Sequence, residues 1–195
     1  MTKYRRKKNI IPLVIIAVVL LLAVLAVLIY RIQRKSFLQN FYPIQYEEWV
    51  DKYSSENGVD KFLVYAVIKT ESDFHSDAVS DVGARGLMQI MEDTFDWIKY
   101  KTDDNEAYYY DMYDPETNIK YGCWLLGYLH DEFGGVEEIA AAYHAGRGNV
   151  NDWLSDKQFS KDGVHLDKIP IGDTEHYVNK ITKAMRYYVE LYEDQ

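Results

Sequence analysis

The sequence predicts an all-α domain behind one N-terminal transmembrane helix. Residues 10–30 contain only apolar and aromatic side chains apart from Pro12. After this run, apolar residues recur every three or four positions through several long segments, which is the period of an amphipathic helix. No alternating apolar and polar pattern of useful length appears, so we do not expect strands. With 195 residues and a single cysteine, the chain has room for one domain that folds on its apolar core without disulfides.

The apolar run at residues 10–30 is long enough to cross a bilayer. Twenty-one helical residues at about 1.5 Å each cover roughly 31 Å, which matches the hydrocarbon thickness. A cleaved signal peptide has a shorter apolar region, roughly 7–15 residues, followed by a cleavage site with small residues. This run instead ends at Tyr30 and Arg31. We therefore expect an uncleaved anchor at 10–30, preceded by a basic cytoplasmic tail at 1–9.

Basic residues flank the anchor unequally. Those before it are Lys3, Arg5, Arg6, Lys7 and Lys8, and those after it are Arg31, Arg34 and Lys35. Cytoplasmic flanks carry the excess of lysine and arginine. The imbalance predicts a single-pass protein of the cell membrane with a cytoplasmic N-terminus and an extracytoplasmic domain.

The part of the chain after the anchor is strongly acidic. Residues 36–195 hold 14 lysines and arginines against 31 aspartates and glutamates, a net charge of −17. Such a surface disfavours a nucleic-acid partner, because phosphate binding requires positive charge. The histidines show no spacing typical of metal ligands. We expect neither a metal nor another cofactor.

Local signals divide the rest of the chain into a connector at 31–43, which ends at Pro43, and one domain at 44–195. Within the domain, the apolar spacing predicts consecutive helices at 44–57 and 59–72, separated by Gly58.

A third helix begins at Asp114-Pro115, because aspartate suits the N-cap and proline suits the first helical position. It continues through Phe133 and stops at Gly134-Gly135. The remaining expected elements are a short helix of small residues at Val136–Ala145, a further turn at Val150–Leu154 and a long terminal helix at Asp173–Tyr192. The irregular stretches expected to supply the loops of a cleft are 73–85, 100–113 and 155–172.

Glu71 continues the apolar face of the second helix. It lies three residues after Ile68 and four after Val67, on the stripe that also holds Val64. Burying a carboxyl group raises its pKa, and a carboxyl that stays protonated near neutral pH can act as a general acid. Spacing alone fits more simply a glutamate at a helix end with its carboxylate in water.

Three other features carry weak signals when each is taken alone. Two glycines, Gly83 and Gly86, precede an apolar turn and permit a ligand to approach the backbone, although they also suit an ordinary tight loop. The pair Tyr143-His144 ends a helix of small residues, where such a pair commonly packs in the core. A tyrosine cluster around residues 108–113 could stack on sugar rings or cover a helical core.

Four sequence blocks in a fixed order change this interpretation. They are Glu71-Ser72 at a helix end; Ser80 followed by Gly83-Ala84-Arg85-Gly86-Leu87-Met88-Gln89-Ile90; Ala142-Tyr143-His144-Ala145-Gly146 followed by Gly148, Val150 and Trp153-Leu154; and Ile169-Pro170 leading to Tyr177-Val178. Together they resemble the catalytic domain of the soluble-lytic-transglycosylase family, which is related in fold to goose-type lysozyme. The resemblance covers residues from about 59 to 190 and implies a lysozyme-like helical fold.

The resemblance implies that Glu71 is the catalytic acid and base in cleavage of peptidoglycan strands. The bond concerned is the β-1,4 bond between N-acetylmuramic acid and N-acetylglucosamine, and the product carries a 1,6-anhydro-muramic end, so that no water is consumed. The residues implied to line the glycan groove are Ser80, Met88, Gln89, Tyr143, His144 and Tyr177. Of these, Met88 is expected to pack on a sugar ring, and the polar residues to bond to sugar or to Glu71.

Two positions depart from the family pattern. His144 stands where the family usually has asparagine, and Asp173 where it usually has glutamate. The charge of a histidine changes near pH 6.5, so glycan binding is expected to depend on pH.

Two alternatives to a transglycosylase remain open from the sequence. One is a lysozyme-type hydrolase on the same fold, in which Asp73, Asp77 or Asp81 activates water. The other is a glycan-binding module without catalytic activity, which the departures at His144 and Asp173 would suggest.

Overall fold

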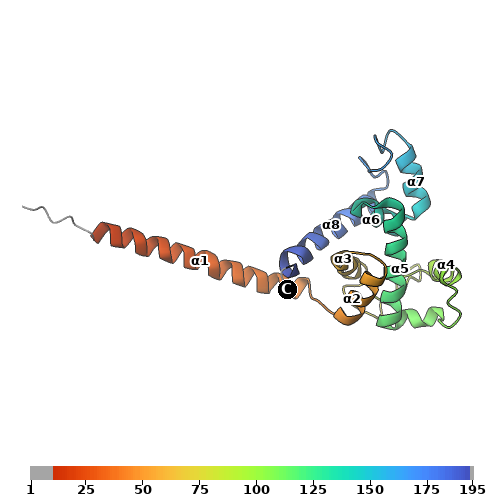
Figure 1. Cartoon of the computed structure of the whole chain (residues 1–195), viewed down its shortest axis with the longest axis horizontal. Coiled ribbons are helices and arrows are strands. Elements are labelled where there is room, and N and C mark those ends of the chain that lie inside the picture. Colours follow the sequence, from red (N-terminus) through yellow and green to blue (C-terminus); the bar gives the residue numbers. More distant parts are fainter. Residues whose placement is uncertain (1–10, 194–195) are drawn as a thin grey trace, which may run out of the picture. The chain divides into compact units, whose positions relative to one another are not determined.

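The computed structural model describes residues 11–193. It divides the chain into two compact units, Met1–Pro43 and Ile44–Gln195. The first unit contains α1 (Ile11–Phe41), and the second contains the remaining elements (Figure 1). The predicted basic tail at residues 1–9 lies outside the described residues.

Helix α1 is longer than the predicted anchor. Its part from Val14 to Phe41 is long and apolar enough to cross a membrane, judged by length and composition. The helix continues past Tyr30 through most of the predicted connector, because no glycine or proline interrupts the chain until Pro43. A proline disfavours the helical conformation of the residue before it, which agrees with the helix ending at Phe41.

The domain is built from helices, as the sequence predicts. Its elements are α2 (Glu47–Glu56), α3 (Lys61–Glu71), α4 (Glu92–Thr102), the 3-10 helix η1 (Tyr109–Tyr113), α5 (Pro115–Phe133), α6 (Val136–Ala145), α7 (Arg147–Ser155) and α8 (Gly172–Tyr192). Residues 11–193 contain no strand, and the bridges Val79–Arg85 and Arg85–Ile90 are isolated. The all-α prediction is confirmed.

Capping residues explain where the predicted helices begin and end. The side chain of Asp60 accepts a bond from the Phe62 amide at 2.8 Å and starts α3. Asp114 accepts from the Thr117 amide at 2.9 Å and starts α5. Tyr46 has a left-handed φ of 59°, so α2 begins at Glu47 and not at residue 44.

Three helical segments differ from the sequence prediction. Helix α4 was not predicted; within it only Phe95 and Ile98 are buried, so its apolar stripe is too short to give a clear period. The expected loop at 100–113 contains the end of α4 and all of η1. Helix α7 extends over Arg147–Ser155, beyond the predicted turn at 150–154.

Helix α5 is the centre of the domain and contacts α2, α3, α4, η1 and α6 (Figure 1). Helix α8 packs against α3 and α6. This packing brings the C-terminal end of α3 close to the first turns of α8, although the two segments are far apart in sequence. The candidate active site lies at this junction.

The loop between α3 and α4 depends on close packing at Gly86. This glycine has a φ of +76°, and a Cβ atom there would lie 2.0 Å from the Met112 carbonyl oxygen and 2.3 Å from Asn118 Nδ2. Gly83 has a φ of +89° but nothing within 4 Å of the same position. Both alanine substitutions incur backbone strain, and only Gly86→Ala adds a clash with backbone.

We therefore expect Gly86→Ala to lower the free energy of unfolding by about 2 kcal/mol more than Gly83→Ala does. Urea unfolding followed by tryptophan fluorescence measures both variants. Equal losses of stability would contradict the close packing at Gly86.

Candidate active site

Glu71 is the last residue of α3 and is partly buried at the end of that helix's apolar face. Val64, Val67 and Ile68, on the same helix, have no exposed surface. The next residue, Ser72, donates from Oγ to the Leu87 carbonyl oxygen at 2.8 Å. The end of α3 is thereby tied to the following loop, and Glu71 is held beside it.

One hydrogen bond orients the Glu71 carboxyl group. Tyr177 Oη, on α8, donates to Glu71 Oε1 at 2.7 Å, across 106 positions of sequence. Burial raises the pKa of Glu71 from its ordinary value of 4.5 to about 7, and the Tyr177 bond opposes this rise. A carboxyl group with this pKa exchanges its proton near neutral pH, as a group that acts first as acid and then as base must.

Two tyrosines feel the charge of the Glu71 carboxyl group. Tyr143 Oη, on α6, donates to the Met88 carbonyl oxygen at 2.7 Å. Burial and the nearby Glu71 charge raise the pKa of Tyr143 and of Tyr177 well above the ordinary value of 10. Both phenols therefore stay protonated at neutral pH and act as donors.

Three of the predicted groove residues shape the loop after α3. Ser80 Oγ accepts from the Ala84 amide at 3.0 Å, and Gln89 Nε2 donates to the carbonyl oxygens of Ala78 at 3.1 Å and Gly86 at 2.9 Å. Met88 has no exposed surface, and a Cβ atom on Gly122 would lie 2.1 Å from its sulfur. The Met88 side chain therefore belongs to the core under the loop, and packing of this residue on a sugar ring is not available here. Sugar contacts of Ser80 and Gln89 stay predictions.

Asn118 is an anchor of this loop that sequence reasoning missed. Its Oδ1 accepts from the Met88 amide at 2.8 Å, and its Nδ2 donates to the carbonyl oxygens of Arg85 at 3.0 Å and Met112 at 2.9 Å. The side chain has no exposed surface. In the sequence, Asn118 is a polar residue four positions before Gly122, so the two lie on the same face of α5. A polar residue on that face was the signal that could have identified it.

His144 is exposed and lies against Tyr177. The ring centroids are 4.6 Å apart, with an angle of 28° between the planes. His144 Nδ1 lies 3.2 Å from Thr174 Oγ1. Burial lowers the pKa of His144, and the charge of Asp173 opposes this change.

The three aspartates that could supply a second carboxylate are exposed. Asp73 forms an ion pair with Lys69, and neither Asp77 nor Asp81 contributes to the pKa of Glu71. Within residues 11–193, the influences on the pKa of Glu71 are therefore its burial and the hydrogen bond from Tyr177.

A pocket of about 300 Å³ begins at Tyr143 and is lined also by Trp97, Tyr128 and Gly146. The rings of Trp97 and Tyr128 meet edge to face, with centroids 4.9 Å apart and an angle of 85°. Aromatic faces of this kind can stack on the apolar faces of sugar rings. This pocket shares Tyr143 with the predicted site residues, and neither Glu71 nor Tyr177 lines it.

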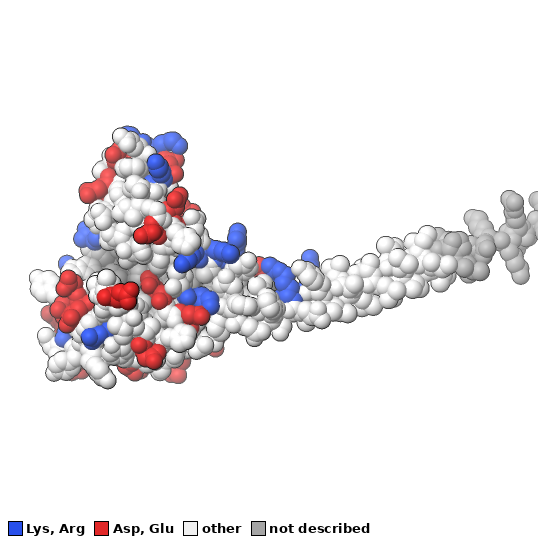
Figure 2. Space-filling view, turned by 180° about the vertical axis from the view of Figure 1, so that it is seen from behind, with Lys and Arg blue, Asp and Glu red and all other residues white. Residues whose placement is uncertain are grey.

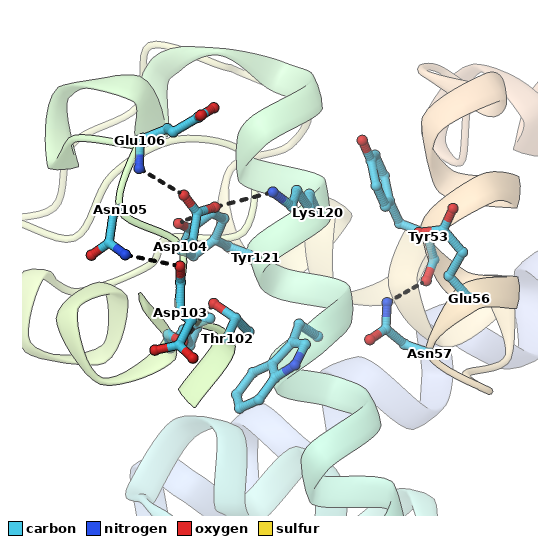
Figure 3. Close-up of a pocket in the computed structure, with 12 residues that line it drawn as sticks. Tyr53, Glu56, Asn57, Thr102, Asp103, Asp104, Asn105, Glu106, Lys120 and Tyr121 are labelled. Atoms are coloured by element: carbon cyan, nitrogen blue, oxygen red, sulfur yellow. Dashed lines mark hydrogen bonds and ion pairs between the residues drawn. The ribbon is translucent and has the colours of Figure 1, made fainter. Parts of the chain in front are cut away.

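A larger pocket, of about 670 Å³, lies elsewhere in the domain (Figure 3). Tyr53 and Glu56 of α2 lie on one side of it, and the loop after α4 lies on the other. Burial acts to raise the pKa of Asp104 there, but bonds from Lys120, two backbone amides and Tyr121 outweigh it and lower the pKa to about 2. None of the predicted site residues lines this pocket, so its size does not make it the candidate active site.

Acidic side chains are spread over the visible face of the domain, between smaller groups of basic ones (Figure 2). This distribution agrees with the net charge of −17 for residues 36–195. The partners of Glu71 and Tyr177 that the structure shows are each other and the His144 ring. Hydrogen bonding and ring contacts are therefore available to recognise a ligand at the candidate site.

Removal of the Tyr177 hydroxyl should raise the pKa of Glu71. The bond from Tyr177 stabilises the ionised carboxylate and so lowers the pKa of this group. We expect Tyr177→Phe to raise the pKa above the value of about 7 by about one pH unit. Titration of the ¹³C-labelled carboxyl resonance of Glu71 measures the change. Tyr143→Phe is the matched control, because Tyr143 bonds to Met88 and leaves the Glu71 bond intact; a similar rise in both variants would contradict the assignment.

The chain is similar to known lytic transglycosylases. The family model described as "Transglycosylase SLT domain" matches residues 48–165. The soluble lytic murein transglycosylase of Escherichia coli strain K12 is 32% identical over 154 residues, which cover 77% of this chain and 24% of that protein. The membrane-bound lytic murein transglycosylase C of Serratia proteamaculans is 28% identical over 169 residues, which cover 74% of this chain and 46% of that protein.

A solved structure agrees with the fold. It is the lytic transglycosylase Slt of Pseudomonas aeruginosa, an inactive mutant with glutamine in place of a glutamate. Its TM-score is 0.66 at 28% sequence identity, covering 77% of this chain and 25% of that one. The chain spans about a quarter of the length of its soluble relatives and under half of the membrane-bound one.

Proposed function

The chain belongs to the transglycosylase SLT family, and from that premise we propose that it is a membrane-anchored peptidoglycan lytic transglycosylase. It cleaves the β-1,4 bond between N-acetylmuramic acid and N-acetylglucosamine and leaves a 1,6-anhydro-muramic end. The single observation that carries this proposal is the environment of Glu71. This partly buried carboxyl group has a pKa of about 7 and accepts one bond, from Tyr177.

The reaction uses Glu71 twice. Protonated Glu71 donates its proton to the glycosidic oxygen, the bond from C1 of the muramic residue to that oxygen breaks, and N-acetylglucosamine leaves with a free hydroxyl. The acetamido group of the muramic residue stabilises the positive charge that develops at C1. The Glu71 carboxylate then takes the proton of the C6 hydroxyl, and the C6 oxygen bonds to C1. Glu71 ends protonated, and no water is consumed.

The surrounding residues suit both halves of this cycle. Burial favours the neutral acid that the first step needs. The Tyr177 bond stabilises the carboxylate that the second step needs. Asp73, Asp77 and Asp81 are exposed, and Asp73 forms an ion pair with Lys69, whereas a two-carboxylate glycosidase needs a second acid beside the scissile bond. This arrangement supports the transglycosylase over the hydrolase.

The products decide the proposal. Purified peptidoglycan is digested with the full chain in detergent, and the released sugars are measured by mass spectrometry. We expect anhydro-muramic ends, which are lighter than reducing ends by one water. Reducing ends would show a lysozyme-type hydrolase instead, and glycan binding without release would show a module that has lost catalysis.

We propose that the chain crosses the membrane once through α1, with the N-terminus in the cytoplasm and residues 44–195 outside. The support is the apolar length of α1 and the excess of basic residues before it. A protease that cannot cross membranes, added to spheroplasts, should digest the domain and spare a tag on the N-terminus. Digestion of the tag, with the domain protected, would show the opposite orientation.

A further inference from the structure

The two positions at which the chain departs from the family pattern meet in the structure. His144 lies near the end of α6, and Asp173 lies in the first turn of α8. The charge of Asp173 acts on the His144 imidazole. Thr174, which is 1% exposed, places its Oγ1 3.2 Å from His144 Nδ1. The two departures therefore belong to one cluster between α6 and α8.

The same imidazole covers the ring of Tyr177. The two rings stack at 4.6 Å between centroids, and the Tyr177 side chain is only 7% exposed. Tyr177 follows Thr174 by three positions, so both side chains lie on one face of α8. His144 thus holds two neighbours at once, one by a hydrogen bond and one by its ring face.

This contact reaches Glu71 through Tyr177. The phenol oxygen of Tyr177 lies 2.7 Å from Glu71 Oε1. The direction of that bond depends on the tilt of the Tyr177 ring, because the ring carries the oxygen rigidly. A ring stacked on one face has less freedom to tilt than one that faces solvent.

We propose that His144 is a positioning residue, which acts through Tyr177 to hold the phenol on the Glu71 carboxyl group. This inference rests on the proposed function, in which Glu71 is the acid and base. It differs from the role expected from the sequence, in which His144 binds sugar. Asparagine, the usual residue of the family at this position, has no ring face to offer. Here the imidazole supplies one, 4.6 Å from the Tyr177 ring between centroids.

The first test measures Glu71 without any substrate. Its ¹³C-labelled carboxyl resonance is titrated in the full chain in detergent, in wild type and in His144→Ala, His144→Phe and His144→Gln. The titratable groups of the described residues that face Glu71 are Tyr143 and Tyr177, and the one that acts on His144 is Asp173. These groups are unchanged in all four proteins.

We expect His144→Ala and His144→Gln to raise the pKa of Glu71 by about half a pH unit, which is about a threefold change in the protonation equilibrium. His144→Phe keeps the ring face and should stay close to wild type. His130→Ala is the matched control, since it removes another exposed histidine, at the end of α5. An unchanged pKa in both ringless variants would overturn the proposal.

Kinetics on peptidoglycan separate positioning from sugar binding. A positioning residue changes kcat, and we expect His144→Ala to lower kcat about threefold or more with a smaller change in KM. A rise in KM with unchanged kcat would show that His144 contacts sugar instead. The double variant His144→Ala with Tyr177→Phe should resemble Tyr177→Phe alone, because residues that act through one another are not additive; additive losses would overturn the proposal.

Folding and function are controlled separately. Urea unfolding identifies any variant that has lost its fold, and His144→Phe then still tests whether the ring alone suffices. If the wild-type chain releases no anhydro ends, the proposed function fails. The titration of Glu71 would still test the link from His144 to Tyr177.

Discussion

Replacement of Glu71 by glutamine is expected to lower the rate of glycan cleavage by about 10²- to 10⁴-fold. Glutamine has nearly the shape of glutamate but can neither donate an acidic proton to the glycosidic oxygen nor accept one from the C6 hydroxyl. Asp73, Asp77 and Asp81 are exposed, so none of them has the burial that raises the pKa of Glu71 to about 7. The measurement is the initial rate at which anhydro-muramic ends are released from peptidoglycan.

The control for this loss is Glu56→Gln. Glu56 is exposed at the end of α2 and lines the larger pocket away from Tyr177. It should keep the wild-type rate, because the substitution removes a carboxylate from the surface and not from the candidate site. If the Glu71→Gln protein cleaved glycan at the normal rate, the proposed mechanism would be wrong.

The second large effect is on stability, which should fall as the pH rises and Glu71 ionises. The folded-state pKa of Glu71, about 7, lies above its ordinary value of 4.5. Below pH 4.5 the group is protonated in both the folded and the unfolded state. Between pH 4.5 and 7 only the unfolded chain has released the proton, so the free energy of unfolding decreases with pH. The total loss from this group is up to about 3 kcal/mol.

The Glu71→Gln variant lacks this pH dependence, so we compare its free energy of unfolding with that of the wild-type chain at each pH. Other ionisable groups titrate alike in the two proteins, so the difference between their unfolding free energies isolates Glu71. We expect the glutamine variant to gain on wild type between pH 4.5 and 7 and to keep a constant advantage above about pH 8. Urea unfolding at pH 4, 6 and 8, followed by tryptophan fluorescence, measures the difference. A difference that does not vary with pH would show that the pKa of Glu71 is not raised.

The Glu71→Gln variant is expected to have both a lower activity and, above pH 4.5, a higher stability than the wild-type chain. Active sites keep groups that the fold alone would not select, and their replacement commonly stabilises a protein while removing its function. An ionised Glu71 beside an apolar helix face is such a group. The two measurements on Glu71→Gln therefore support each other, although each is read out independently.

Local sequence was sufficient for the helices with clear caps and a clear period. Asp114 caps the helix that its position predicts, Asp60 caps the helix that apolar spacing predicts, and Gly134 ends α5 with a φ of 72°. Helix α4 was missed because only Phe95 and Ile98 in it are buried. These successes and this failure have the same cause: caps and periods act over a few residues, so a helix is predictable only where it carries them.

Spacing of three and four drew attention to Glu71 at the end of an apolar stripe, and the resemblance to the transglycosylase family then predicted it to be the catalytic acid. What spacing did not decide was whether this carboxylate lies in water or in the protein. The packing of α8 against α3 decided it, by bringing Tyr177 within 2.7 Å across 106 positions of sequence. That contact depends on how whole helices pack.

The contacts and burial of the other site residues were decided only by the tertiary structure. Met88, expected beside a sugar, is buried against Gly122, and His144, also expected to bind sugar, stacks on Tyr177. By itself the sequence determined the helical class and the apolar N-terminal segment, since these depend on composition and short-range periodicity. The direction in which each remaining side chain points was set by the packing of helices distant in sequence, because only that packing determines which surfaces are buried and which partners are within hydrogen-bonding reach.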